Sequence, residues 1–244
     1  MWIAALLSAV VGIVAGRSIV AEVSAHRRER PDRLWDPECD VCDGSLSMTL
    51  RVCVPQNHRQ RAATPLVPIA TAVVFGAMAI SVPTLWVLPA YLVFAAAMVA
   101  LTMTDLDTQL IPNRILGPTT ALAVGLLVIG GLIAGEPSAL LRAGGGGAAY
   151  LAVMFVLALL ARGGLGFGDV KLAFLIGVFT GYLGWGQVIV AGIGGFLIGG
   201  LVAIVLLVTR RSGRKDAIPF GPFMTLAAII AVVFGEAITQ WYLR

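Results

Sequence analysis

Three aspartates stand where long apolar runs of the chain meet polar sequence, which makes them candidates for acid–base chemistry. Asp105 and Asp107 follow the apolar run 85–104, and Asp169 precedes the run 171–184. A charged group in a membrane helix costs on the order of 2.5 to 3.5 kcal/mol at mid-bilayer and less at the interface, unless it is hydrated, paired or used. A single aspartate of this kind is best explained as a loop residue at the membrane interface. Two at the same depth favour a shared site.

Two carboxylates held close together do not both ionise easily, so they share a proton. The ionised carboxylate then takes a proton from water while the protonated one donates to a carbonyl oxygen, as in aspartic proteases. Gly166 and Gly168 flank Asp169, and residues without a Cβ let a substrate backbone approach a carboxylate closely. The chain holds 29 glycines, so a Gly-x-Gly pair also arises by chance, and helix packing is the alternative role.

The polar stretch 22–65 contains a second group of chemically active residues. Its spacing is Cys-x2-Cys-x10-Cys-x4-His, formed by Cys39, Cys42, Cys53 and His58. Three thiolates and one imidazole are sufficient for a closed tetrahedral zinc site. The alternative is a metal-free loop whose thiols are free or redox-active. An odd number of cysteines within one short stretch argues against a secreted disulfide scaffold.

The composition requires a membrane to position these residues. The 244-residue chain is 59% hydrophobic and 12% charged, with a mean hydropathy of +0.93, whereas soluble domains are roughly 45–50% apolar and 25% charged. These values exclude a large water-exposed catalytic domain and a disordered chain. They also exclude an ordinary nucleic-acid-binding domain, although the net charge is +4.

The apolar runs predict an all-α polytopic membrane protein with about eight transmembrane helices. The expected spans are 3–21, 66–83, 85–104, 114–134, 145–162, 171–184, 186–208 and 221–240. Tight turns are expected at Pro83 and Gly184, and Gly144 to Gly147 are expected to open the fifth span. The sixth run is short, so a tilted or partly re-entrant helix is an alternative to a full crossing.

Three regions follow from this pattern: a first helix over 1–21, a polar loop with the cysteine cluster over 22–65, and a seven-helix core over 66–244. No basic residue precedes Arg17, so the first helix is expected to be retained and not cleaved as a signal peptide. Cytoplasmic loops retain positive charge. Placing the loop 22–65 in the cytoplasm puts all but two of the 17 Lys and Arg residues on that side, the exceptions being Arg142 and Arg244. Both termini then lie outside, and all three aspartates lie at the cytoplasmic face.

Three motifs in order resemble the type IV prepilin peptidases, membrane aspartic proteases of the GxGD class. They are Asp105-Leu106-Asp107-Thr108-Gln109-Leu110-Ile111-Pro112-Asn113, Gly166-Phe167-Gly168-Asp169-Val170-Lys171-Leu172 and Ile218-Pro219-Phe220-Gly221-Pro222-Phe223. The resemblance covers most of the chain from about residue 66 onward. It implies that Asp105 and Asp169 are the catalytic pair and that Asp107 is secondary. Asn113 stands where the family pattern has Asp.

The resemblance also implies a substrate and a place of action in the inner membrane. The expected substrates are type IV prepilin-like or pseudopilin proteins of pilus and type II secretion systems, cleaved at the cytoplasmic membrane face after a short basic leader and just before their hydrophobic helix. The expected substrate-binding residues lie in the three motifs: Gly166, Gly168, Lys171, Pro112, Asn113, Pro219 and Gly221. Lys171 could pair with a carboxylate or with an acidic substrate side chain, or be an ordinary positive-inside residue. Pro219 and Pro222 could instead only shape the entry of the last span.

Cleavage by this mechanism requires no cofactor, but two further activities of the first loop stay open. Many family members carry two CxxC pairs thought to bind zinc, whereas here Gln56 replaces the partner of Cys53. Larger members also methylate the new N-terminus with S-adenosylmethionine. The segment Gly16-Arg17-Ser18-Ile19-Val20 lacks the Asn of the corresponding family stretch, so a peptidase without methylation is equally open.

Two alternative functions compete with this interpretation. A transporter or proton-coupled carrier would also use intramembrane carboxylates, but it often shows two similar halves and mid-membrane sites, and neither is evident here. A presenilin-like protease of generic membrane helices would show Tyr-Asp and Pro-Ala-Leu, whereas here Thr104 precedes Asp105 and Ile-Pro-Phe-Gly-Pro replaces Pro-Ala-Leu. Membrane lipid is an expected partner and nucleic acid is not; the sequence does not fix the oligomeric state.

Overall fold

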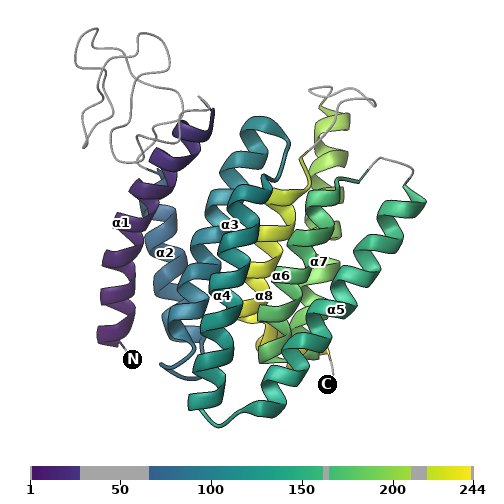
Figure 1. The fold of residues 1–244 in the computed structure, drawn as a ribbon. Helices are drawn as coiled ribbons and strands as arrows, with labels where there is room; N and C mark the ends of the chain where they lie inside the picture. Colours follow the sequence, from purple (N-terminus) through teal and green to yellow (C-terminus); the bar gives the residue numbers. More distant parts are fainter. Residues whose placement is uncertain (1, 28–65, 162–164, 210–218, 243–244) are drawn as a thin grey trace, which may run out of the picture. The chain divides into compact units, whose positions relative to one another are not determined.

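The computed structural model describes residues 2–27, 66–161, 165–209 and 219–242, and these residues are helical with short connections. The chain divides into two compact units, residues 1–76 and 77–244. The helices are α1 (Trp2–Arg27), α2 (Leu66–Ser81), α3 (Leu88–Thr108), α4 (Asn113–Ile133), α5 (Pro137–Leu160), α6 (Phe167–Leu183), α7 (Trp185–Val208) and α8 (Gly221–Tyr242) (Figure 1). The predicted all-helical class is confirmed.

Five of these helices are long and apolar enough to cross a membrane. They are Leu88–Leu106, Asn113–Ile133, Pro137–Leu160, Trp185–Val208 and Gly221–Tyr242. Ile3–Ile19 and Val67–Ser81 are shorter apolar helices, and α6 has 17 residues. Large apolar side chains of α7, such as Ile189, Ile193 and Leu197, are exposed on the surface of the unit, as expected of helices that face lipid.

In the first unit, α1 lies close against α2 because glycines stand at the contact. A Cβ added to Gly12 would lie 2.8 Å from Ala72 Cα, and one added to Gly16 would lie 2.7 Å from Pro68 Cα. The α1 helix also continues to Arg27, beyond the predicted end at residue 21.

In the second unit, an aromatic contact fixes α3 against α6. Tyr91 Oη donates a hydrogen bond of 2.7 Å to the Phe179 carbonyl oxygen, and the rings of Phe94 and Phe179 stack with centroids 4.4 Å apart. All three side chains are fully buried. This contact sets the relative positions of the two helices that carry Asp105 and Asp169.

The α5 helix packs along α6 through glycines. It also begins earlier than the predicted span 145–162. Gly144 to Gly147 do not open a helix, because α5 begins at Pro137 and contains them. A Cβ on Gly146 would lie 2.6 Å from the Gly177 carbonyl oxygen, so glycine permits the close approach of the two backbones.

Arg142, one of the two exceptions to the charge bias, has a structural role at the far end of α6. Its guanidinium donates to the carbonyl oxygens of Gly181 (2.9 Å) and Tyr182 (2.7 Å). These carbonyls belong to the last turn of α6, where helices leave acceptors without intrahelical partners. A cation is favoured there.

Candidate active site

Asp105 lies in the last turn of α3, inside the helix and not after it. The helix continues to Thr108, where Gln109 adopts a left-handed conformation (φ 53°) and donates its N–H to the Asp105 carbonyl oxygen. The carboxylate is almost fully buried, with 4% of the residue exposed. Its depth in the unit excludes the simple interpretation of an exposed loop carboxylate.

The Asp105 carboxylate is held by the beginning of α8. The backbone N–H of Gly221 donates to Asp105 Oδ2 at 3.0 Å, and Gly221 is the first residue of that helix. Free N–H groups and the helix dipole at a helix N-terminus favour a negative charge. A Cβ on Gly221 would lie 2.6 Å from Asp105 Oδ2, so this contact requires glycine.

Asp169 occupies the first turn of α6, which begins after the extended N-cap residue Gly166. Its backbone N–H donates to the Gly166 carbonyl oxygen at 3.1 Å, and 8% of the residue is exposed. A Cβ on Gly166 would lie 3.3 Å from Asp169 Oδ2. This glycine therefore keeps the immediate surroundings of the carboxylate open.

The second glycine of the motif serves a contact within the chain. A Cβ on Gly168 would lie 2.8 Å from Ile111 Cβ, so the α3–α4 connection packs directly on the first turn of α6. Pro112, the extended N-cap of α4, follows Ile111. The first two motifs thus meet at Gly168, and the third, which contains Pro219, meets Asp105 through Gly221.

The structure brings the two aspartates into electrostatic contact. The pKa of Asp169 is raised to about 6, mainly by burial and additionally by the negative charge of Asp105, while a backbone hydrogen bond at Gly166 opposes the shift. Asp169 lies just outside the expected membrane span 171–184, at its first end. A proton shared between two such carboxylates is the arrangement required for acid–base activation of water.

Two threonines that the sequence analysis missed join α3 to α8 one turn below Asp105. The hydroxyls of Thr102 and Thr225 are 2.6 Å apart, and each also lies within hydrogen-bond distance of a carbonyl of its own helix, Met98 (2.7 Å) and Pro222 (3.0 Å). Because a hydroxyl has a single proton, one threonine donates to the other, which donates to its own helix. The sequence signal for Thr102 is its position three residues before Asp105, which puts a polar side chain on the same face of the helix as a candidate catalytic group. The sequence contains no such signal for Thr225.

A buried tyrosine of α5 also interacts with Asp169. Tyr150 is 4% exposed, its ring lies against Gly192 of α7, and its phenol interacts electrostatically with the Asp169 carboxylate. No motif marks this residue; a tyrosine three positions after a glycine-rich segment was the available signal.

Lys171 is directed toward α4. Its Nζ donates to Asn113 Oδ1 at 2.9 Å and lies 5.7 Å from the centroid of the Phe167 ring. Among the side chains that the structure describes, no carboxylate pairs with Lys171. The lysine and Asn113 are therefore brought together at the ends of their helices.

The four predicted metal ligands Cys39, Cys42, Cys53 and His58 lie outside the described residues, as does the remainder of the loop 28–65. Within the described ranges no cluster of three His, Cys, Asp or Glu side chains is arranged to hold a metal ion.

Comparison with known proteins identifies a family. The model of the type IV leader peptidase family matches residues 92–204, a segment that contains both Asp105 and Asp169. Three relatives carry the name prepilin leader peptidase/N-methyltransferase. The protein of Aeromonas hydrophila is 33% identical over 182 residues, covering 73% of this chain and 61% of the relative. That of Pseudomonas aeruginosa is 31% identical over 182 residues (74% and 61%), and that of Bacillus subtilis is 30% identical over 193 residues (79% and 74%).

The chain spans about three fifths of the length of the Aeromonas and Pseudomonas proteins that it matches. No solved structure matches the chain.

Proposed function

This chain belongs to the type IV leader peptidase family, and we propose that it is a membrane aspartyl endopeptidase. It cleaves the basic leader of type IV prepilin-like or pseudopilin proteins. The observation that carries this proposal is the meeting of Asp105 and Asp169, which lie on different helices yet interact as two nearly buried carboxylates. The relatives described above bear peptidase names, so the transporter alternative is not proposed.

The two aspartates take different roles in the proposed mechanism. Asp105 accepts a hydrogen bond from the α8 N-terminus, which stabilises its ionised form against the effect of burial. Asp169, whose pKa is raised to about 6, carries the shared proton. Asp105 is therefore the general base and Asp169 the general acid.

Each step conserves atoms and protons. Asp105 takes a proton from water as the water oxygen bonds to the scissile carbonyl carbon, and Asp169 gives its proton to the carbonyl oxygen. The tetrahedral intermediate then collapses: the C–N bond breaks, the nitrogen takes the proton held by Asp105, and the hydroxyl proton returns to Asp169. The products are a leader with a free carboxylic acid and a mature chain with a free amine; the acid then passes its proton to the amine or to water and becomes a carboxylate.

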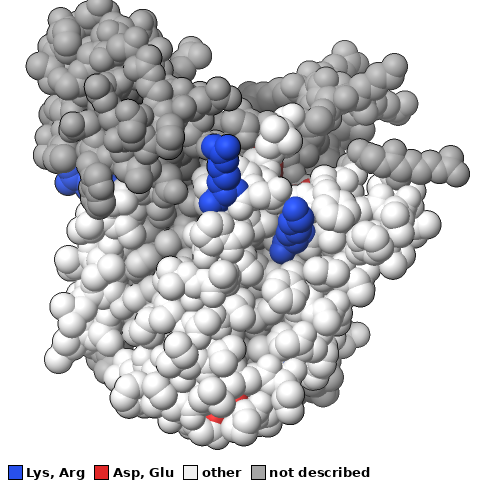
Figure 2. Space-filling model, viewed as in Figure 1, with Lys and Arg blue, Asp and Glu red and all other residues white. Residues whose placement is uncertain are grey.

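We further propose that the chain crosses the inner membrane eight times, with both termini outside and the site at the cytoplasmic face. The C-terminal end of α3 and the N-terminal ends of α4, α6 and α8 lie at one end of the bundle (Figure 1). On the face in Figure 2, the Lys and Arg side chains of α4 and α6 lie toward that same end. The charge bias of the loops supports the orientation.

The remaining substrate contacts are proposed from their positions. Gly166 and Gly221 adjoin the two carboxylates, and Gly168 and Pro112 meet where the α3–α4 connection contacts α6. Pro219 leads into α8. A substrate backbone in extended form lies among these residues, three of which are glycines without a side chain.

The first loop is proposed to hold a structural zinc ion through Cys39, Cys42, Cys53 and His58, a donor set that suits Zn²⁺. The chemistry of cleavage is assigned to the aspartates and not to this metal. Methylation, the second activity in the relatives' names, would require S-adenosylmethionine and is tested separately by the mass of the mature product.

The deciding experiment uses a type IV prepilin-like substrate, co-expressed or in detergent, with the wild-type chain, Asp105→Asn and Asp169→Asn. Wild type should cut at the leader junction, and neither variant should cut when present at equal membrane levels. Cleavage by an Asn variant at the wild-type rate would exclude the paired-carboxylate mechanism.

A further inference from the structure

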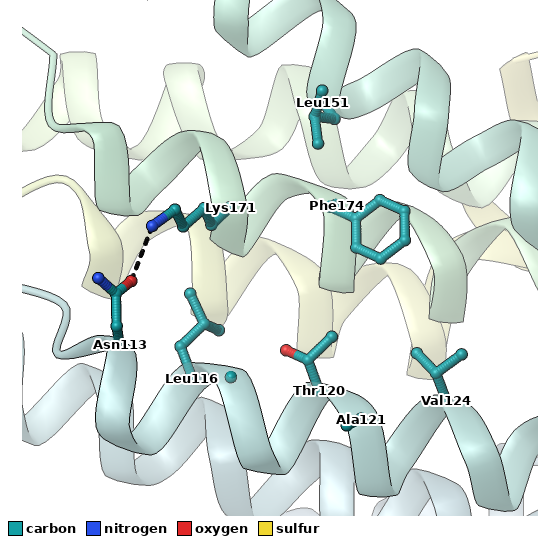
Figure 3. A pocket seen from close by; sticks show the side chains of 9 residues that line it. Asn113, Leu116, Thr120, Ala121, Val124, Leu151, Lys171 and Phe174 are labelled. Carbon is teal, nitrogen blue, oxygen red and sulfur yellow. Dashed lines mark hydrogen bonds between the residues drawn. The ribbon is translucent and has the colours of Figure 1, made fainter.

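A groove of about 530 Å³ runs between α4 and α6, next to the proposed active site. One wall is the α4 face of Asn113, Leu116, Gly117, Thr120, Ala121 and Val124, and the other is formed by Lys171 and Phe174 of α6 with Leu151 of α5 (Figure 3). Residues 113, 117, 120, 121 and 124 follow helical spacing, so they share one side of α4. The groove is therefore an elongated channel along a helix.

The lining of the groove is apolar except at one end. Among the described residues that line the groove, Lys171 is the only charged one, and none of them is a carboxylate. The ammonium carries three N–H donors, of which one is directed to Asn113 Oδ1 (Figure 3). Within the part of the chain that the structure describes, the ammonium otherwise contacts only the Phe167 ring, so the occupant that complements the groove is an apolar segment with one anionic group near its end.

The charged end of the groove adjoins the catalytic dyad. Lys171 follows Asp169 by two residues on α6, a rise of about 3 Å along the helix axis. On the opposite wall, Asn113 follows Ile111, which packs on Gly168. An occupant whose chain continued past Lys171 would pass over this contact toward the two carboxylates.

We infer that this groove binds the apolar helix of the substrate, with Lys171 pairing with an acidic side chain near the start of that helix. The inference rests on the proposed function and adds the site that holds the substrate after its scissile bond. Anchoring the helix in this way would deliver the preceding extended segment to Asp105 and Asp169 in a fixed register.

A matched pair of glycine substitutions tests the groove itself. Gly117 and Gly125 both lie on α4, and a Cβ at either meets nothing within 4 Å, but only Gly117 lines the groove. Gly117→Leu fills the groove, whereas Gly125→Leu places the same side chain outside it. We expect Gly117→Leu to raise KM for a full-length substrate by about tenfold at nearly unchanged kcat, and Gly125→Leu to act as wild type.

A substrate peptide truncated before its apolar helix separates binding from catalysis. Its cleavage should be equal in Gly117→Leu, Gly125→Leu and wild type, because it does not enter the groove. If both leucine variants cleave the full-length substrate like wild type, the groove proposal is wrong while the peptidase stands. If wild type cleaves neither substrate and Asp105→Asn changes nothing, it is the proposed function that fails.

The role of the Lys171 charge is tested by exchanging the charges of Lys171 and of its proposed partner on the substrate. Lys171→Glu should raise KM about tenfold for a substrate whose first two helical turns contain an acidic residue. It should have no such effect when that residue is changed to Gln, and a substrate with Lys at the position should restore binding to Lys171→Glu. An equal loss with the acidic and the Gln substrate would overturn the role of Lys171.

Cross-linking identifies the occupant. A photoreactive benzoylphenylalanine at Thr120, in the centre of the groove, should form an adduct with the substrate helix in Asp169→Asn, where the substrate persists uncut. Adducts carrying only phospholipid, or only a second copy of this chain, at saturating substrate would overturn the proposal.

Discussion

The backbone N–H of Gly221 donates to the carboxylate of Asp105 across 3.0 Å, joining two residues that are 116 positions apart in the chain. The contact explains why a glycine stands at the first position of α8. It also predicts what an added methyl group would do there.

Gly221→Ala should impair catalysis strongly. The new Cβ would stand 2.6 Å from Asp105 Oδ2, so either the carboxylate or the start of α8 must move, and a displacement near 1 Å can cost on the order of 10²-fold in rate. The measurement is kcat/KM for a prepilin-like substrate. Gly200→Ala on α7 is the control, because a Cβ there meets nothing within 4 Å. Equal activities would show that Gly221 does not position Asp105.

The pH profile of kcat/KM should be bell-shaped. As the pH rises through about 6, Asp169 loses the proton that it must donate, and at low pH Asp105 becomes protonated and no longer accepts one. The two limits belong to the pair and not to the single residues. A flat profile between about pH 5 and 9 would contradict a shared proton.

Asp169→Asn should raise the melting temperature near pH 7.5 while abolishing cleavage. The folded-state pKa of Asp169 is raised from 3.8 to about 6, so the stability contributed by its protonated form is complete below pH 3.8 and lost as the pH rises through 6. Asn removes this penalty. At pH 4 the difference in melting temperature between the variant and wild type should largely vanish, and an equal gain at both values would assign the effect to something other than titration.

Thr102→Val and Thr225→Val should each lower kcat with little change in KM, because the hydroxyl pair fixes α3 against α8 beside Asp105. Loss of one neutral hydrogen bond costs about 1 kcal/mol. The double variant should be no more impaired than the more affected single variant, since both remove the same interaction. Strictly additive losses would show that the two hydroxyls act independently.

Zinc in the first loop should be detected by elemental analysis at one ion per chain and be absent from Cys39→Ser. Chelation should unfold the loop, since ligands of a structural zinc ion contribute folding energy. Absence of zinc combined with unchanged activity would remove the proposed site.

The sequence by itself determined the helical class and the candidate carboxylates. Membrane-length apolar runs require helices because backbone polar groups cannot remain unpaired in lipid. Asp105, Asp107 and Asp169 stood out because each adjoins such a run, and the resemblance of the motifs to a known family then indicated Asp105 and Asp169 as the pair. These are local signals, so they can be recognised without knowing how the helices pack.

Only the tertiary structure decided which residues surround those carboxylates. The contact of Asp105 with Gly221, the Thr102–Thr225 pair and the position of Tyr150 each join residues far apart in the chain. The same holds for Gly146, whose segment was predicted to open a helix but lies inside α5, against α6. In a chain with 29 glycines, small residues can pack against many neighbours. Which helices pair depends on which of their backbones can approach most closely. The groove between α4 and α6 is a consequence of that pairing.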